Sequence, residues 1–338
     1  IFDTGSSWLW TSMEGCNCSG ISGPELATSD ITSWVPLGKT EKIGYGSGTA
    51  KGQLGTVTAY FSETVSVTGQ HVIMMEEAQM VQSPTSGIFG LSHRYGSDNY
   101  DTIIYELFNQ GKISTMVFTV ALRPDDSKPN SGSYITIGEV SYDETLSGQE
   151  YYWVPLKDTG VYRYYYSFDV GRFAIGGVEL LNYIGIADTG TSLLAVPEEF
   201  LNNLSDSFES SYTCDMEDGT IVCDCSGTSE FPNLTVQIGT QEWTIDPSYY
   251  INYISGGQCQ ILVEQSPPGG ILILGDVFLR NMVVAFDLSN QQIGFASNVK
   301  QTAPQVKPVV TGHTGGELSA SGLYMSFLTI LACLIFAQ

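Results

Sequence analysis

Short hydrophobic segments separated by glycine and serine dominate the chain. Between residues 28 and 85, runs rich in valine, threonine, isoleucine and tyrosine alternate with turn-forming residues, which is typical of strands joined by hairpins. Residues 114–122 and 134–137 have the same character, so we predict further strands there. Residues 123–133 are rich in proline, aspartate and serine and are expected to form a surface loop. The pattern predicts a mainly β protein.

Two segments predict helices. Residues 102–110 form an amphipathic pattern that ends at Gly111. The apolar face of this helix is expected to consist of Ile103, Ile104, Leu107 and Phe108. Residues 198–208 are the second predicted helix.

The sequence Asp-Thr-Gly occurs twice, each time after two apolar or small residues and before two hydroxyl residues. The copies are residues 1–7 and 186–192. From average residue usage, one such match is expected by chance in roughly one chain per thousand. An apolar approach that ends in Asp-Thr-Gly is typical of a buried strand that stops at a turn. One copy alone would be read as an ordinary turn, but two copies are not a coincidence.

A second repeat indicates that the chain contains two copies of one lobe. Ile-Phe-Gly in the first half and Ile-Leu-Gly in the second are spaced equally from the two aspartates. Gly90 follows Asp3 by 87 positions, and Gly275 follows Asp188 by 87 positions. Two such lobes facing each other would bring Asp3 and Asp188 together in a cleft.

Together these motifs resemble the pepsin-like aspartic proteases over residues 1–298. The Gly-Tyr-Gly-Ser-Gly segment at residues 44–48 resembles the flap of that family, and Trp10 resembles the tryptophan that contacts it. Residues 273–278 resemble the closing signature of the second lobe. The resemblance implies an all-β (mainly) bilobal fold, with two pseudo-symmetric β-rich lobes and a few short helices.

The resemblance also divides the chain. Residues 1–149 would form the first lobe, with the first Asp-Thr-Gly and the flap, and residues 150–299 the second; the crossing is expected near residues 148–158. Members of the family have a strand-rich segment before the first Asp-Thr-Gly, preceded by a signal peptide and an inhibitory propeptide. We therefore expect a fragment at the N-terminus, a zymogen in full length, and poor folding of the chain as given.

The resemblance assigns Asp3 and Asp188 as the catalytic pair. The residues that would support this pair are Thr4, Gly5, Ser6, Thr189, Gly190 and Thr191. The two threonines that follow the aspartates would join the loops by reciprocal hydrogen bonds. The two glycines would let backbone amides approach the pair. Ser6 and Thr191 would bond the outer carboxylate oxygens.

The flap and the cleft are assigned in the same way. The flap residues that would close over a bound peptide are Tyr45, Gly46 and Ser47, with the Tyr45 hydroxyl toward Trp10. The cleft is expected to include Ile1, Thr85 and Ile88. Thr85 stands where the family usually has a bulky apolar residue, which weakens any preference for aromatic substrates. Asp276 would influence the pair, or else be an ordinary turn aspartate.

Two opposed carboxylates suit the hydrolysis of peptide bonds at acidic pH. They cannot both ionise readily, so the pair holds one proton while its charged member activates a water. The histidines are His71, His93 and His313, and no Gly-x-Ser-x-Gly occurs, which leaves little for a serine or cysteine triad. A two-carboxylate glycosidase would need carboxylates on dissimilar elements. The other reading is a catalytically silent peptide-binding relative.

The glycine-rich flap segment does not predict a nucleotide site. No strand-to-helix unit or Gly-Lys pair follows it, as a phosphate-binding loop would require. No cofactor or metal is expected. Protein or peptide substrates are the expected partners of a monomer.

The chain is strongly acidic. Its 338 residues include 36 acidic and 13 basic ones, which gives a net charge of −23, and 42% of the residues are hydrophobic, which is ample for packed cores. The charge argues against nucleic acid or an anionic membrane surface as a partner. It suits an acidic compartment, or it serves only solubility.

Seven cysteines and three Asn-x-Ser/Thr sites, at Asn17, Asn203 and Asn233, indicate passage through the secretory route. The expected location is the cell surface or an acidic endolysosomal compartment. By resemblance, Cys225 would pair with Cys259, which leaves Cys214 for Cys223, although four cysteines allow three pairings. A Cys16–Cys18 bond would occupy the small disulfide loop of the family. A zinc cluster is disfavoured because no histidine lies nearby.

Composition changes after the second lobe. Residues 300–322 are rich in proline, threonine, glycine and serine and predict a flexible stalk. Residues 323–338 form a hydrophobic tail, shorter than the roughly 20 residues of a full membrane span. Such a tail after a polar spacer fits a signal that is exchanged for a glycolipid anchor. A tail anchor or a short span is the alternative.

Overall fold

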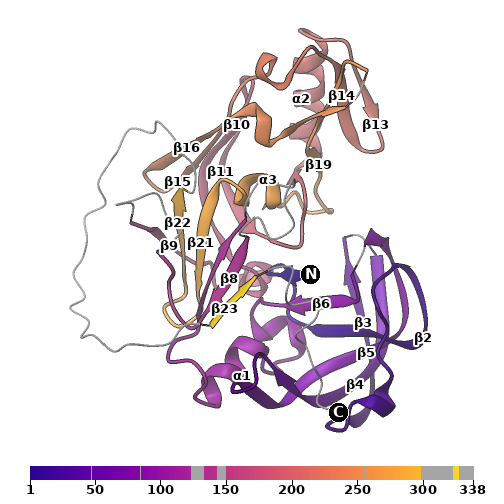
Figure 1. The fold of residues 1–338 in the computed structure, drawn as a ribbon. Helices are drawn as coiled ribbons and strands as arrows, with labels where there is room; N and C mark the ends of the chain where they lie inside the picture. The colour runs from indigo at the N-terminus through magenta and orange to yellow at the C-terminus, as the bar shows by residue number, and fades with distance from the viewer. Residues whose placement is uncertain are drawn as a thin grey trace.

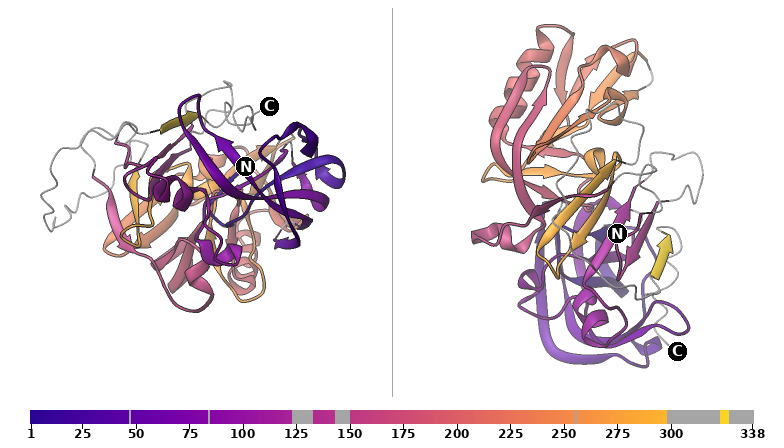
Figure 2. Two further views of the ribbon diagram at one scale, coloured as in Figure 1. Left: turned by 90° about the horizontal axis from the view of Figure 1, so that it is seen from below. Right: turned by 90° about the vertical axis from the view of Figure 1, so that its left-hand side faces the viewer.

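The computed structural model describes residues 1–46, 48–83, 85–122, 133–142, 150–254, 256–297 and 323–326. They form two β-rich lobes on a shared sheet (Figure 1). Turned by 90° about the vertical axis, the molecule is elongated, with one lobe at each end (Figure 2). The mainly β, bilobal fold expected from the sequence is confirmed.

The first lobe is built on a six-stranded sheet in the order β1-β6-β2-β5-β4-β3. Its strands are β1 (Phe2–Asp3), β2 (Leu9–Ile21), β3 (Val35–Tyr45), β4 (Gly48–Tyr60), β5 (Ser66–Ser83) and β6 (Gly87–Gly90). In β4, buried Ala50 and Leu54 alternate with exposed Thr49 and Gln53, because successive side chains point to opposite faces of a sheet. The strands predicted between residues 28 and 85 are therefore present.

The second lobe contains two sheets. The larger has the order β16-β15-β10-β11-β20-β12-β19, and the smaller β13-β14-β18-β17. The strands of the larger sheet are β10 (Ser167–Ile175), β11 (Val178–Ala187), β12 (Leu194–Val196), β15 (Leu234–Ile238), β16 (Gln241–Ile245), β19 (Val263–Gln265) and β20 (Leu272–Leu274). Those of the smaller sheet are β13 (Cys214–Glu217), β14 (Thr220–Asp224), β17 (Ile251–Ile254) and β18 (Gln258–Ile261).

A fourth sheet, in the order β23-β8-β7-β21-β22-β9, joins the two halves of the chain. Its strands are β7 (Val117–Ala121), β8 (Tyr134–Ile137), β9 (Tyr152–Pro155), β21 (Met282–Asp287), β22 (Gln292–Ser297) and β23 (Leu323–Ser326). Ala121 of β7 pairs with Val283 of β21, so strands from both halves are neighbours. The predicted crossing near residues 148–158 includes β9, and the lobe boundary at residues 149 and 150 stays a prediction.

Most of the predicted tail lies outside the described residues. Of residues 323–338 only β23 is described, and Leu323 pairs there with Ile137 of β8. The predicted stalk at residues 300–322 and most of the loop at residues 123–133 also lie outside them. In the part of the chain that the structure covers, no helix has the length and apolar character needed to cross a bilayer.

The two lobes repeat one arrangement of strands. In the first, β6 pairs in parallel with β1 and antiparallel with β2, which pairs in parallel with β5. In the second, β20 pairs in parallel with β11 and antiparallel with β12, which pairs in parallel with β19. The register agrees as well, because each parallel pair joins residues that are 87 positions apart. Asp3 pairs with Gly90 in the first lobe, and Ala187 pairs with Leu274 in the second. The equal spacing of the sequence repeats is therefore the register of two equivalent strand pairs.

The helices are few and short. They are α1 (Ile103–Asn109), α2 (Glu198–Glu209) and α3 (Asp276–Leu279), and the 3₁₀ turns are η1 (Thr28–Asp30), η2 (Arg94–Ser97), η3 (Gly160–Tyr164), η4 (Thr228–Glu230) and η5 (Pro247–Tyr249). Both predicted helices are present, whereas α3 was not expected. Phe108 was wrongly placed on the apolar face of α1, because it is 39% exposed. At about 100° per residue, it lies beside the stripe formed by buried Ile103, Ile104 and Leu107.

Candidate active site

Each aspartate stands where a short strand ends beside its parallel neighbour. Asp3 is the last residue of β1, and its carbonyl accepts a hydrogen bond from Leu91 N at 2.8 Å, just beyond β6. Asp188 follows β11 directly, and its N–H donates to Leu274 O of β20 at 3.3 Å. The parallel pairing therefore carries both side chains to equivalent strand ends.

Within the first loop, the carboxylate of Asp3 accepts hydrogen bonds from the residues that follow it. Gly5 N donates to Oδ1 at 2.8 Å, and the Ser6 hydroxyl donates to Oδ2. The side chain is almost fully enclosed, because Asp3 is 5% exposed. Its orientation is thus fixed by one backbone and one hydroxyl donor.

The second loop has the same pair of donors. Gly190 N donates to Oδ1 of Asp188 at 2.8 Å, and the Thr191 hydroxyl donates to Oδ2 at 2.7 Å. Asp188 is only partly buried. The two loops therefore share their hydrogen bonds but differ in solvent exposure.

Two buried threonines join the loops. Thr4 N donates to Thr189 Oγ1 at 3.1 Å, and Thr189 N donates to Thr4 Oγ1 at 3.0 Å. Each hydroxyl also donates across to the other lobe, from Thr4 to Ala187 O at 2.9 Å and from Thr189 to Phe2 O at 2.7 Å. Because every donor crosses between the lobes, this network fixes the position of one aspartate relative to the other.

The glycines of the two loops lie against the opposite carboxylates. A Cβ atom on Gly5 would lie 2.5 Å from Cγ of Asp188. A Cβ atom on Gly190 would lie 2.7 Å from Cγ of Asp3 and 3.2 Å from Oδ1 of Asp188. Both carboxylates therefore face one small volume, and any side chain at either glycine would collide with them.

Burial and mutual repulsion alter the acidity of the pair. Burial, followed by the facing Asp188 carboxylate, raises the pKa of Asp3 to about 7, although hydrogen bonds from Ser6 and Gly5 oppose the shift. Carboxylates this close titrate as a pair rather than singly; a dyad of this kind in aspartic proteases is the standard illustration of the effect. The site therefore retains one proton over the acidic range.

Two further polar groups lie near the pair. Burial raises the pKa of Asp276 to about 7, with Arg280 opposing and Asp188 adding to the shift. Burial, then the charges of Asp188 and Asp3, raises the pKa of Tyr165. The sequence singled out Asp276 but missed Tyr165, for which the available signal was a run of tyrosines just before β10.

The predicted flap is the hairpin of β3 and β4. Trp10 is 1% exposed, and its indole N–H donates to the Tyr45 hydroxyl at 2.7 Å, with the ring centroids 6.5 Å apart. Burial, followed by the charge of Asp3, raises the pKa of Tyr45, which keeps the phenol neutral. Gly46 is exposed in the turn, and Ser47 lies outside the described residues.

The three predicted cleft residues lie close together: Ile88 is on β6, Thr85 just precedes that strand, and Ile1 is at the start of the chain. Ile88 is 5% exposed and packs in the cluster that contains Trp10. Thr85 is buried, and its hydroxyl donates to Gly87 O at 2.8 Å. The amino group of Ile1 donates to Gly87 O at 3.0 Å, while its side chain is 44% exposed. The Thr85 hydroxyl is therefore already hydrogen-bonded to the backbone.

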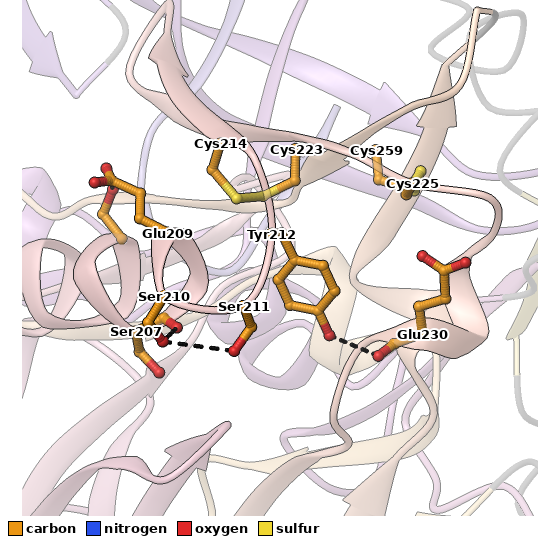
Figure 3. The surroundings of a disulfide bond; sticks show 11 residues. Ser207, Glu209, Ser210, Ser211, Tyr212, Cys214, Cys223, Cys225, Glu230 and Cys259 are labelled. Atoms are coloured by element: carbon orange, nitrogen blue, oxygen red, sulfur yellow. Dashed lines mark hydrogen bonds between the residues drawn. A yellow bond between two sulfur atoms is a disulfide. The ribbon is translucent and has the colours of Figure 1, made fainter.

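The structure joins the cysteines in the pairs suggested by the sequence. The pairs are Cys16–Cys18, Cys214–Cys223 and Cys225–Cys259. Figure 3 shows the two bonds of the second lobe side by side on the small sheet. The predicted glycosylation residues Asn17, Asn203 and Asn233 are all exposed. No group of three or more His, Cys, Asp or Glu residues that could hold a metal ion occurs in the described part of the chain.

Comparison with known proteins agrees with this geometry. Residues 1–298 match the family model of the eukaryotic aspartyl proteases. Gastricsin from Macaca fuscata fuscata is 30% identical over 314 residues, which cover 88% of this chain and 79% of the relative. Pepsin A from Bos taurus is 31% identical over 315 residues, with the same coverage of 88% and 79%. The chain therefore belongs to the eukaryotic aspartyl protease family.

Proposed function

We propose that the protein is an aspartic endopeptidase that hydrolyses peptide bonds of proteins at acidic pH. The observation that supports this most is the placement of Asp3 and Asp188 around one small volume, with matching hydrogen bonds on each carboxylate. Neither aspartate nor either neighbouring glycine is altered. Such an alteration would have favoured the alternative, a silent peptide-binding relative.

The reaction uses the single proton that the pair retains. The charged carboxylate takes a proton from a water held between the two side chains, and the water oxygen attacks the peptide carbonyl carbon. The protonated carboxyl donates to the carbonyl oxygen, which stabilises the negative charge that develops there. Collapse of the tetrahedral intermediate breaks the C–N bond, and the leaving nitrogen takes a proton from the pair.

The hydrogen bonds of the two loops keep the pair ready for this chemistry. Ser6 and Thr191 donate to the outer oxygens, so the inner oxygens remain directed at the water. The cross-lobe bonds of Thr4 and Thr189 hold the distance between the carboxylates. Fixing the groups before substrate binds avoids a reorganisation cost during the reaction.

The flap supplies the cover for an extended substrate. Tyr45 is held by Trp10 near the tip of the β3–β4 hairpin. Closure of this hairpin, with Gly46 in its turn, would hold the chain of the substrate over the pair and exclude bulk water. A covering hairpin of this kind suits unfolded or extended protein segments as substrates.

A secretory route is part of the proposal. Three disulfide pairs and three exposed Asn-x-Ser/Thr sites suit an oxidising compartment. A site that needs one shared proton suits an acidic compartment. The cell surface is the other proposed location. The lobes would span residues 1–149 and 150–299.

The decisive test is digestion of a denatured protein by the purified protein at about pH 3–5, where one carboxylate of a pair is protonated. Cleavage should stop with a statine-type mimic of the transition state. The Asp188→Asn variant should lose about 10⁴-fold in kcat/KM, since it removes the acid–base group. Full activity in this variant would refute the mechanism, and binding of peptide without cleavage by the unaltered protein would support the silent relative.

A further inference from the structure

His93 is a buried titratable residue that the proposed reaction does not use. It lies three residues beyond the end of β6 and is 3% exposed. The imidazole makes no hydrogen bond with any described residue. Its neighbours are the rings of Tyr166 and Tyr95, with centroids 4.9 Å and 6.4 Å away. An imidazole enclosed in this way disfavours the charged form, and burial lowers the pKa of His93 to about 4.

The backbone at His93 is tied to the first aspartate loop. The Ser7 hydroxyl donates to His93 O at 2.5 Å, and Ser92 N donates to Ser6 O at 2.9 Å. Ser6 is the residue whose hydroxyl bonds the Asp3 carboxylate. A displacement of His93 would therefore act on the residues that orient Asp3.

The ring of His93 packs on a residue tied to the second aspartate loop. Tyr166 is fully buried, and its carbonyl accepts a hydrogen bond from Ala187 N at 3.1 Å, one residue before Asp188. The Tyr166 hydroxyl donates to Leu91 O at 2.7 Å. His93 thus lies between the supports of the two loops.

The charges around the imidazole do not provide a partner for its cationic form. Asp158 attracts a proton to it, but this carboxylate is 74% exposed and is therefore well screened. Arg163 lies 3.9 Å from Asp158 and 4.1 Å from the centre of the Tyr95 ring, so the carboxylate of Asp158 already has a cation beside it. Arg94 is paired with Asp101 at 3.1 Å. The other aromatic rings against Tyr166 are uncharged phenylalanines.

We propose that His93 is a positioning residue whose protonation at low pH disturbs both aspartate loops and so sets the acid limit of catalysis. The inference rests on the proposed function. A charged imidazole must gain water or leave the Tyr166 ring, because it has no partner in its pocket. Either movement shifts the His93 carbonyl that holds Ser7, and it disturbs Tyr166, whose own carbonyl bonds the strand end before Asp188. Misplacement of reacting groups by about 1 Å can cost roughly 100-fold in rate.

The same residue affects folding in a fixed pH window. Its folded-state pKa lies below the ordinary value of 6.5, so as pH falls the unfolded chain takes up a proton first. This contribution destabilises the folded state progressively from pH 6.5 to about 4. Below that range both states are protonated, and the residue causes no further loss.

The test compares His93→Phe with His71→Phe in the full chain. Phenylalanine keeps a planar ring that cannot take a proton. His71 is a matched control, because its ring also stacks on a tyrosine, Tyr100 at 4.3 Å, but on β5 of the first-lobe sheet. The dependence of kcat/KM on pH is measured for one peptide substrate from about pH 2 to pH 7.

We expect the acid limb of the unaltered protein and of His71→Phe to lie near pH 4, where the imidazole titrates. In His93→Phe the limb should move down by about one pH unit, which is tenfold in proton activity. An unchanged limb in active His93→Phe would overturn the inference.

A second measurement does not depend on a variant that folds. The chain has three histidines, so the imidazole of His93 can be followed by NMR through the same pH range. Its titration should coincide with the acid limb of kcat/KM, and a titration near its ordinary pKa of about 6.5 would contradict the inference. Absence of cleavage at every pH would instead contradict the proposed function. The two measurements therefore distinguish that failure from a failure of the inference about His93.

Discussion

The two Asp-Thr-Gly loops have matching hydrogen bonds in unequal surroundings. In both, a backbone glycine N–H at 2.8 Å and a hydroxyl bond the carboxylate. Asp3, however, is 5% exposed and lies on the side of the flap, whereas Asp188 is partly open to solvent. The comparison shows that the repeated motif determines the hydrogen bonds of each carboxylate, whereas the surroundings of each loop determine its tendency to ionise. Two chemically different roles can therefore come from one duplicated motif.

A second difference lies one residue beyond the matching glycines. Gly90 is followed by Leu91, which is fully buried, and Gly275 is followed by Asp276. The second lobe therefore has an extra carboxyl group behind its aspartate, where the first lobe has only hydrocarbon. Because of this difference between the lobes, the surroundings of the two aspartates are less alike than the hydrogen bonds of the loops suggest.

Among changes that keep both aspartates, the largest expected effect comes from breaking the close approach between the loops. Gly5→Ala and Gly190→Ala each place a methyl group against the opposite carboxylate. We expect kcat/KM to fall about 100-fold in each, because such a displacement misaligns the reacting groups. Gly227→Ala is the control, since a Cβ there meets no atom within 4 Å. Full activity in either loop variant would show that the two loops do not face each other as described.

The threonine network tests whether the lobes depend on each other. Thr4→Val and Thr189→Val each remove a hydroxyl that makes two buried cross-lobe bonds. Each should lower the free energy of unfolding by about 3 kcal/mol, because buried groups lose their partners. The double variant should cost less than the sum, since both changes affect one network.

Serine at either threonine position keeps the hydroxyl and serves as the control for that comparison. Its free energy of unfolding, measured by denaturant titration, should lie close to that of the unaltered protein. A loss below about 0.5 kcal/mol in both valine variants, the range of an ordinary surface change, would mean that the network does not hold the lobes together.

Asp276 sharpens the comparison through pH. Its pKa is raised to about 7 in the folded state, mainly by burial, so the folded state holds a proton that the unfolded chain has released. Its contribution to stability is therefore present at about pH 4 and is lost as pH rises toward 7. Asp276→Asn should flatten the pH dependence of the unfolding free energy by about 3 kcal/mol over that range. An equal slope in both proteins would exclude Asp276 as a source of the asymmetry.

The close approach of Asp3 and Asp188 could be predicted from sequence because the repeat is local and occurs twice. Equal spacing of the two glycines from the two aspartates indicated the same strand register in both lobes. Parallel pairing in that register places both aspartates at equivalent strand ends. Thr85 shows where such reasoning ends. Its position beside the cleft was expected, but its hydroxyl donates to the backbone at Gly87. This hydrogen bond depends on the local backbone conformation, which the sequence pattern does not give.

Residues whose role depends on packing between distant segments were not predictable. Tyr165 approaches both aspartates only because the segment before β10 packs beside the two loops, and the run of tyrosines around it does not indicate which one does so. His93 likewise acquires its burial from Tyr166, which is 73 positions away. No periodicity reports contacts of this kind, because they are set by tertiary structure.

The flap gives the smallest effect and tests the hairpin of β3 and β4 in the first lobe. Tyr45→Phe keeps the ring but removes the hydroxyl that accepts from Trp10 at 2.7 Å. One such hydrogen bond contributes about 1 kcal/mol, so kcat/KM should fall about fivefold and the free energy of unfolding should fall by no more than about 1 kcal/mol. Tyr253→Phe, at a 51% exposed position in the second lobe, should leave activity unchanged. If Tyr45→Phe alters only stability, then the hairpin of β3 and β4 is a structural edge of the first lobe, and the cover over the pair must come from another segment.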